Sequence, residues 1–114
     1  MKIPKQIKIG GKVYKVEITE KLELGRGYDA ECVYSDLVIR VRPTMAKGKM
    51  ECDFLHEMFH AIHDFFGYNK HDEKKIDELA NALYMVIQDN PEIFEKDLVD
   101  SDYLLRNDKT DISA

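Results

Sequence analysis

The sequence predicts an α+β fold in which a small antiparallel sheet of about four strands precedes two helices. In the first 42 residues, apolar and polar side chains alternate in short segments that turn residues separate in pairs. From about residue 47 the apolar side chains recur at intervals of three and four residues, which is the spacing of a helical face. The chain has 114 residues, 44% of them hydrophobic and 34% charged, which fits one ordinary globular domain.

The first two strands are predicted on either side of Gly10-Gly11. Isoleucines alternate with polar residues over residues 3–9, and Val, Tyr and Ile alternate with charged residues over residues 13–18. Because glycine adopts positive φ angles without strain, this pair of segments fits the two-residue loop of a β-hairpin.

A second pair of strands is predicted around the turn Ser35-Asp36. Residues 32–34 precede the turn, and Leu37–Arg42 follows it with apolar residues on one face. The other face of Leu37–Arg42 carries arginines, so we expect this strand to lie at an edge of the sheet. Pro43 ends the strand because proline has no main-chain N–H for a sheet ladder.

Two helices follow the strands. Apolar periodicity predicts the first over residues 47–66, and Gly67 stands where a helix C-terminus favours a left-handed residue. Asp72 is a good N-cap for the second helix, with Glu73 in its first turn. The second helix ends before Pro91, since the residue that precedes a proline avoids helical angles.

The predicted domain covers residues 1–94, and residues 95–114 form an acidic tail with one weak helical stretch at residues 98–105. The net charge of −5 and the lack of a basic and aromatic stripe argue against a nucleic-acid partner. No apolar run approaches the roughly 20 residues that span a bilayer, and the N-terminus lacks the apolar core of a signal peptide. We therefore expect a cytoplasmic protein without a membrane partner, in which Cys32 and Cys52 are buried reduced thiols rather than a disulfide.

One motif carries chemistry: His56-Glu57-Met58-Phe59-His60, inside the first predicted helix. Residues four apart lie on one helical face, so His56 and His60 can bind one Zn²⁺ at roughly 2.0–2.1 Å. Glu57 is rotated by about 100° from His56, which keeps it off the metal but near enough to act as general base toward water. The alternative is a pair of helix histidines without a metal, since such a motif arises by chance in on the order of one chain in a hundred.

A hydrolytic zinc site needs a third protein ligand. The extended motif HExxHxxGxxH does not occur, because His63 and Phe66 occupy the positions of its glycine and its third histidine. The second helix offers two adjacent acids, Asp77 and Glu78. Helical phase places Asp77 at the edge of the apolar face and Glu78 nearly opposite that face, so we predict Asp77 as the third ligand and keep Glu78 as the alternative.

The neighbouring polar residues receive other predictions. His71, in the loop between the helices, is a weaker ligand candidate and is expected to be exposed. Cys52 is expected to pack in the core as a small hydrophobic residue. His63 is expected to be structural, either pointing at solvent or capping a carbonyl group. Asn81, one turn after Asp77, can brace that ligand.

These residues resemble a known family. Strands, then HEMFH on one helix, then DELANALY on the next and DNP at its end resemble the compact gluzincin-type zinc metallopeptidases, in particular the ImmA/IrrE-type proteins and small phage-encoded metallopeptidases. The resemblance covers about residues 30–92. It implies a minimal zincin-like fold in which His56 and His60 bind zinc and Glu57 is the general base. It also places Asp77 where the family usually has Glu.

The sequence therefore predicts a Zn²⁺-dependent peptidase that hydrolyses peptide bonds, with a protein or peptide as substrate and a regulatory protein as a further candidate partner. An extended substrate is expected to pair with Leu37–Arg42, and a tyrosine or His71 to stabilise the transition state. The rival hypothesis is a metal-stabilised interaction module, such as a phage-borne regulator, that binds a protein without cleaving it. The two hypotheses differ at the fourth coordination position, which the acidic tail could fill.

Overall fold

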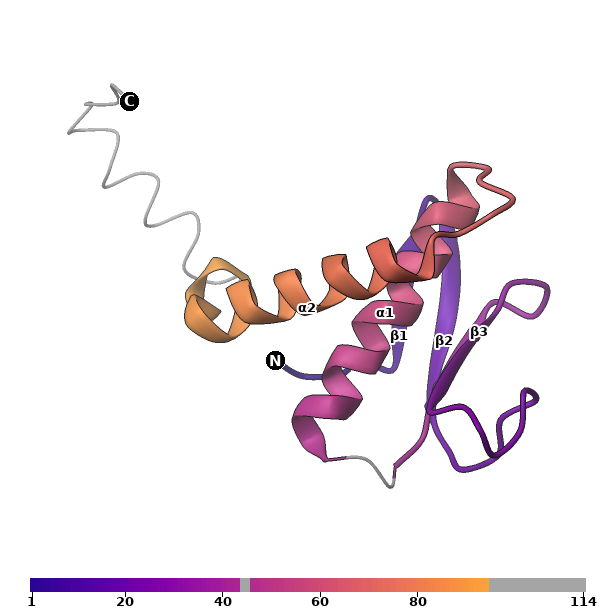
Figure 1. Cartoon of the computed structure of the whole chain (residues 1–114), viewed down its shortest axis with the longest axis horizontal. Coiled ribbons are helices and arrows are strands. Elements are labelled where there is room, and N and C mark those ends of the chain that lie inside the picture. The colour runs from indigo at the N-terminus through magenta and orange to yellow at the C-terminus, as the bar shows by residue number, and fades with distance from the viewer. Residues whose placement is uncertain (44–45, 95–114) are drawn as a thin grey trace.

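The computed structural model describes residues 1–43 and 46–94 (Figure 1). Its elements in chain order are β1 (Gln6–Ile9), β2 (Lys12–Ile18), β3 (Ala30–Val33), β4 (Val38–Val41), α1 (Lys47–Phe65), α2 (Glu73–Asp89) and the short 3-10 helix η1 (Pro91–Phe94). The sheet, α1 and α2 form three successive layers, with α1 in the middle. The predicted α+β class is confirmed, while the predicted tail and its helical stretch lie outside the described residues.

Local sequence signals set several element boundaries. Gly10-Gly11, with φ angles of 57° and 87°, forms the turn between β1 and β2. Gly67 follows α1 with a φ of 83°. Asp72 caps α2, because its Oδ1 accepts hydrogen bonds from the main-chain N–H groups of Lys74 at 3.1 Å and Lys75 at 3.2 Å. These predicted boundaries are confirmed.

The strand order in the sheet is β1-β2-β4-β3, and the sheet is mixed. β1 pairs with β2 and β3 pairs with β4 in antiparallel fashion, whereas β2 and β4 run parallel. The prediction of an antiparallel sheet is therefore wrong at the centre of the sheet. The reason is topological. Residues 19–29 lead from β2 to β3, which is not the neighbour of β2, and β4 then returns between these two strands.

The prediction that Leu37–Arg42 is an edge strand is also wrong, because β4 lies between β2 and β3. The charge of Arg40 suggested that this side of the strand faces solvent, but its guanidinium bridges the two neighbouring strands. Nε donates to Glu17 of β2 at 2.9 Å, and Nη1 donates to Glu31 of β3 at 2.8 Å. Cross-strand ion pairing, not an edge position, explains the charged residue in this strand.

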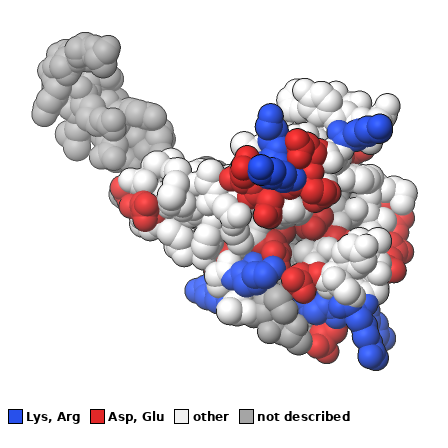
Figure 2. Space-filling model, in the orientation of Figure 1, with Lys and Arg blue, Asp and Glu red and all other residues white. Residues whose placement is uncertain are grey.

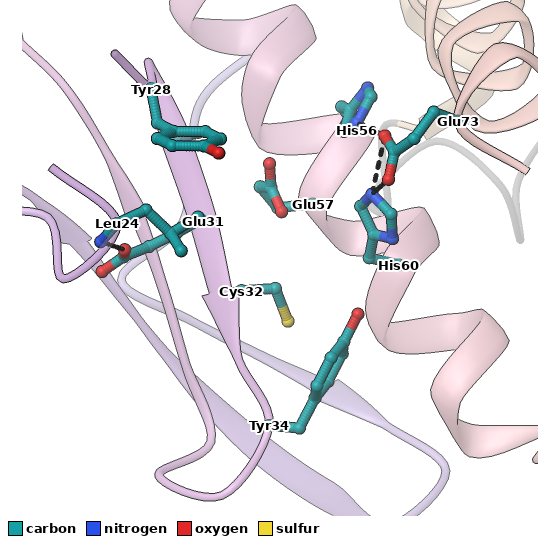
Figure 3. A pocket seen from close by; sticks show the side chains of 10 residues that line it. Leu24, Tyr28, Glu31, Cys32, Tyr34, His56, Glu57, His60 and Glu73 are labelled. Carbon is teal, nitrogen blue, oxygen red and sulfur yellow. Dashed lines mark hydrogen bonds and ion pairs between the residues drawn. The ribbon is translucent and has the colours of Figure 1, made fainter. Parts of the chain in front are cut away.

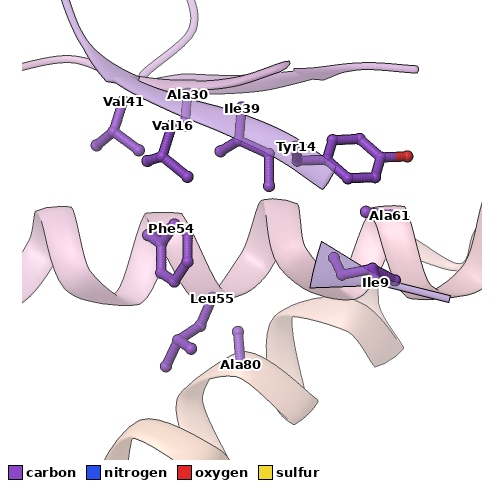
Figure 4. Packing of buried hydrophobic residues seen from close by; sticks show 10 residues of the cluster. All are labelled: Ile9, Tyr14, Val16, Ala30, Ile39, Val41, Phe54, Leu55, Ala61 and Ala80. Carbon is purple, nitrogen blue, oxygen red and sulfur yellow. The ribbon is translucent and has the colours of Figure 1, made fainter. Parts of the chain in front are cut away.

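The hydrophobic core lies between the sheet and α1, and a smaller contact joins α1 to α2 (Figure 4). The buried cluster consists of Ile9, Tyr14, Val16, Ala30, Ile39, Val41, Phe54, Leu55, Ala61 and Ala80. The central strands and α1 supply most of it. α2 contributes fewer buried residues, Ile76 and Ala80, and packs the partly buried Leu83, Tyr84 and Ile87 against the cluster. Apolar contacts therefore also help to hold α2 in place.

Residues 19–29 form a loop whose shape is fixed by hydrogen bonds from the sheet. Arg42 donates to three carbonyl oxygens at 2.9–3.0 Å, all of them at or next to this loop. Glu31 of β3 accepts hydrogen bonds from the main-chain N–H groups of Glu23 at 3.1 Å and Leu24 at 3.0 Å. The loop is thereby held in place beside β3.

Glu31 is a buried carboxylate, 2% exposed. Burial alone would raise its pKa. The hydrogen bond from Arg40 and those from the main-chain N–H groups of Leu24 and Glu23 outweigh burial and hold the pKa below its ordinary value of 4.5. The fold therefore stabilises the ionised form of Glu31.

Both cysteines are free thiols, as predicted, although Cys32 and Cys52 are partly rather than fully buried. Within residues 1–43 and 46–94, no helix is long and apolar enough to cross a bilayer.

Replacing Glu31 by Gln is expected to lower the free energy of unfolding at pH 7 by about 1–3 kcal/mol, because the partly buried guanidinium of Arg40 loses a charged partner. Since the folded-state pKa of Glu31 is lowered, its contribution is present above about pH 4.5 and is lost as the pH falls through the folded-state pKa. Urea unfolding of both proteins at neutral and acidic pH measures this effect, and the difference between them should narrow in acid.

Glu23→Gln is the matched control. The Glu23 side chain is 61% exposed and lies 3.9 Å from Nη1 of Arg40, so its loss should change the free energy of unfolding by less than about 0.5 kcal/mol. Equal losses in the two variants would contradict the role given to Glu31.

Candidate metal centre

The HEMFH motif lies in the middle of α1. His56 and His60 point toward the first turn of α2, while Glu57 points toward β3 (Figure 3). The ring centroids of the two histidines are 5.0 Å apart, as expected for residues separated by one helical turn. His60 is buried and His56 is partly exposed. Helical geometry therefore turns the two imidazoles one way and the carboxyl group the other way.

The carboxylate that meets both histidines belongs to Glu73, at the start of α2. Its Oε1 lies 3.1 Å from Nε2 of His56 and 3.2 Å from Nε2 of His60, and its Oε2 lies 3.0 Å from the latter atom. One ligand atom from each of these residues lies within 4.8 Å of the other two. Two atoms that bind one tetrahedral zinc ion at about 2.0–2.1 Å are roughly 3.3 Å apart, so the observed separations suit a shared ion.

Asp77, the predicted third ligand, contacts the other nitrogen of His56. Its Oδ1 lies 3.2 Å from Nδ1 of that ring. Glu78, the alternative, is exposed and does not belong to the group of converging ligand atoms. The geometry favours Glu73 as third ligand and gives Asp77 the place of a residue that orients His56.

The sequence contained a signal for Glu73 that the prediction did not use. Glu73 precedes Asp77 by four residues, so the two acids lie on the same face of α2, one turn apart. Its place after the N-cap Asp72 gave it another explanation, because acids are favoured in the first turn of any helix. Which turn reaches the histidines depends on how far α1 and α2 overlap, and no local pattern encodes that overlap.

The donor set suits a divalent cation. The Asp77 carboxylate only accepts, so Nδ1 of His56 carries a proton, and Nε2 is the ring atom that faces Glu73. Burial lowers the pKa of His60, which favours its neutral form. At 3.1–3.2 Å from a carboxylate oxygen, each Nε2 either donates a proton to it or, once deprotonated, can share a cation with it. Imidazole nitrogen and carboxylate oxygen are both common zinc ligands.

The surface around the centre carries both signs. The first half of α2 exposes the acids Glu73, Asp77 and Glu78 and also Lys74 and Lys75, and Figure 2 shows acidic side chains gathered in this region with basic ones beside them. The surface charge therefore does not by itself select a cation.

A cavity of about 520 Å³ lies between α1 and β3, beside the histidines (Figure 3). Its lining includes Tyr28, Cys32 and Tyr34 on the sheet side and His56, Glu57 and His60 on the helix side. Burial raises the pKa of the Cys32 thiol to about 12, so this thiol stays protonated at neutral pH. The cavity is partly open to solvent and lies next to the two histidines, with Glu57 in its wall.

Glu57 has a perturbed acidity. Burial raises the pKa of Glu57 to about 7, while His56 lowers it and the carboxylates of Glu73 and Asp53 raise it. A carboxyl group with this pKa can accept and release a proton near neutral pH. That property suits the role of general acid and base.

The remaining predictions about polar residues have mixed outcomes. His63 donates from Nδ1 to the carbonyl oxygen one turn before it at 2.8 Å, which confirms a carbonyl-capping role. Cys52 is not a simple core residue, because its Sγ lies 2.9 Å from Oδ1 of Asn81 on α2. His71 is partly buried rather than exposed, and its Nδ1 lies 2.7 Å from Nδ1 of His60.

In the metal-free protein, Glu57→Gln is expected to raise the free energy of unfolding above pH 7 by on the order of 2–3 kcal/mol, because a charged carboxylate is no longer buried. The pKa of Glu57 rises on folding from 4.5 to about 7, so wild-type stability falls as the pH rises through that interval. Unfolding in the presence of a chelator should show a more stable variant at about pH 8 and nearly equal proteins at about pH 5.

The exposed Glu78→Gln serves as control and should leave stability unchanged at both pH values. A stability difference between Glu57→Gln and wild type that does not grow with pH would count against a buried, perturbed carboxyl group.

Comparisons of the chain with protein-family models, with curated proteins and with solved structures give no match. What the centre does follows from the chemistry of its own residues.

Proposed function

We propose that this chain is a zinc-dependent peptidase in which His56, His60 and Glu73 hold the ion, with Asp77 as the alternative third ligand. The observation that carries the proposal is the convergence of two imidazole nitrogens and a carboxylate beside a cavity. A hydrolytic zinc site has three protein ligands and leaves a position for water. The resemblance of the HEMFH helix to gluzincin-type metallopeptidases supports the same conclusion.

The residues around the centre have complementary roles in peptide hydrolysis. When bound by these residues, zinc would supply Lewis acidity toward water and a substrate carbonyl. Glu57, in the wall of the cavity beside the two histidines, is placed to take the proton of the attacking water and to deliver it to the leaving amine. Tyr34 directs its hydroxyl toward His60 across the cavity (Figure 3). Burial raises the pKa of Tyr34, so the hydroxyl keeps its proton and can donate to a developing oxyanion.

We place the substrate along β3 instead of Leu37–Arg42, because β4 has strands on both sides and β3 on one side only. The main-chain N–H of Arg42 donates to the carbonyl of Asp29 at 2.9 Å. Hydrogen-bonded and non-bonded pairs alternate in an antiparallel ladder, so Ala30 and Cys32 direct their main-chain groups away from β4. Both residues line the cavity, where an extended peptide can pair with them.

Metal analysis tests the ligand set. Wild type purified without chelator should carry about one zinc per chain, and His60→Ala should carry none, because one ligand fewer does not hold the ion. Glu73→Gln should also lose zinc, whereas Asp77→Asn should weaken binding by roughly 10–100-fold without abolishing it. Glu78→Gln is the matched control and should keep the full stoichiometry.

The reverse pattern, with zinc retained in Glu73→Gln and absent from Asp77→Asn, would make Asp77 the third ligand. A wild-type protein that takes up no stoichiometric zinc on reconstitution would remove the proposal altogether.

Glu57→Gln separates catalysis from metal binding. The variant should bind zinc as wild type does but hydrolyse peptides about 10²–10⁴-fold more slowly, because the general base is missing. Mass spectrometry of a peptide library incubated with each protein measures the rates. Native-rate cleavage by the variant would show that another group is the base. Zinc-loaded wild type that cleaves nothing would favour the rival interaction module.

A further inference from the structure

His71 lies next to the buried ligand His60, in the loop that joins α1 to α2. The Nδ1 atoms of the two rings are 2.7 Å apart, a hydrogen-bond distance. Only one proton fits between two nitrogens at this separation. One ring therefore donates and the other accepts, and the rest of the network decides which.

The second nitrogen of His71 settles the direction of this bond. Nε2 of His71 lies 3.1 Å from the carbonyl oxygen of Tyr68. A carbonyl oxygen only accepts, so Nε2 of His71 carries a proton. With that single proton on Nε2, Nδ1 of His71 is the atom that can accept from His60. The proton between the rings therefore belongs to Nδ1 of His60.

With the proton between the rings on Nδ1 of His60, the atom left to bind a metal is Nε2, which faces the carboxylate of Glu73 at 3.0 Å. A metal ion there would replace any proton that Nε2 donates to this carboxylate. The nitrogen of a histidine that binds a metal is set by the hydrogen bond that the other nitrogen makes. We propose that His71 is a positioning residue that holds His60 in the Nδ1-protonated tautomer and directs its Nε2 lone pair into the metal centre. The proposal rests on the proposed function only for the identity of the ion.

Several contacts hold His71 in this place. Its ring meets Tyr34 edge-on with centroids 6.1 Å apart, and the ring of His63 lies 5.6 Å away. The main-chain N–H of Tyr68 donates to the carbonyl of His63 at 3.2 Å, which fixes the turn that presents the acceptor for His71. The loop after α1 therefore positions a neutral acceptor behind one ligand, as Asp77 positions a charged acceptor behind the other.

Two substitutions separate the two hydrogen bonds of His71. In His71→Asn, the amide oxygen can take the place of Nδ1 and accept from His60, but the donor to Tyr68 is lost. In His71→Gln, the longer amide can reach the carbonyl of Tyr68 with its N–H, but the acceptor next to His60 is lost. Both variants introduce a carboxamide side chain, and they differ in which of the two hydrogen bonds of His71 they keep.

Zinc affinity, measured by competition with a chelator, should be near that of wild type in His71→Asn. It should fall by roughly 10–100-fold in His71→Gln and in His71→Ala. The opposite order, with native affinity in His71→Gln and a loss in His71→Asn, would mean that His71 only holds the loop and would overturn the proposal. Native affinity in all three variants would overturn it as well.

The tautomer is measured independently of zinc. In metal-free protein at about pH 8.5, two units above the usual imidazole pKa of about 6.5, nitrogen-15 NMR should show His60 protonated on Nδ1 in wild type and His71→Asn. His71→Gln should lose this preference. A wild-type His60 that is protonated on Nε2 and not on Nδ1 would overturn the proposal. If the tautomer is as stated but wild type binds no zinc, the proposed function fails and the role of His71 stands.

Discussion

The candidate centre depends on the register between α1 and α2. Three side-chain contacts follow one another along the helix crossing: Cys52 with Asn81 at 2.9 Å, His56 with Asp77 at 3.2 Å, and His60 with Glu73 at 3.0 Å. Each contact lies four residues later on α1 and four residues earlier on α2, so matched turns of antiparallel helices meet. A slip of one turn would bring Asp77 to His60 and leave Glu73 beyond both histidines. Metal-ligand geometry is thus a consequence of helix packing.

Apolar contacts support this register but are not directional. Ile76 and Ala80 are the buried residues of α2, and Ala80 lies on the side of α1 that carries Leu55 (Figure 4). Small and flexible apolar surfaces tolerate sliding, whereas paired polar groups lose their partners when they slide. The hydroxyl of Tyr84, which donates to the buried Glu51 at 2.9 Å, adds one more contact of this directional kind. The polar pairs therefore set the register between α1 and α2, and the apolar contacts stabilise the packing of the two helices.

The parts of the fold that the sequence predicts well are those with local causes. Gly10-Gly11 and Asp72 fix a turn and a helix start through their own backbone and side-chain preferences, and α1 follows from its apolar spacing. The prediction of an edge strand from Arg40 was wrong because the partners of this residue, Glu17 and Glu31, lie on other strands and are distant from it in sequence. The same limit applies to the centre. The spacing of HEMFH is local and brings two histidines together, whereas which acid of α2 meets both of them depends on the overlap of the two helices.

An ion at the centre would have a structural as well as a chemical effect. Glu73 and Asp77 bring carboxylates to the histidines, and burial raises the pKa of Glu57 beside them. An ion that binds only the folded state stabilises that state by an amount that grows with its affinity and concentration. Because its proposed ligands come from both helices, that stabilisation would act on the α1–α2 crossing. Zinc would then hold α2 in the register that creates its own third ligand.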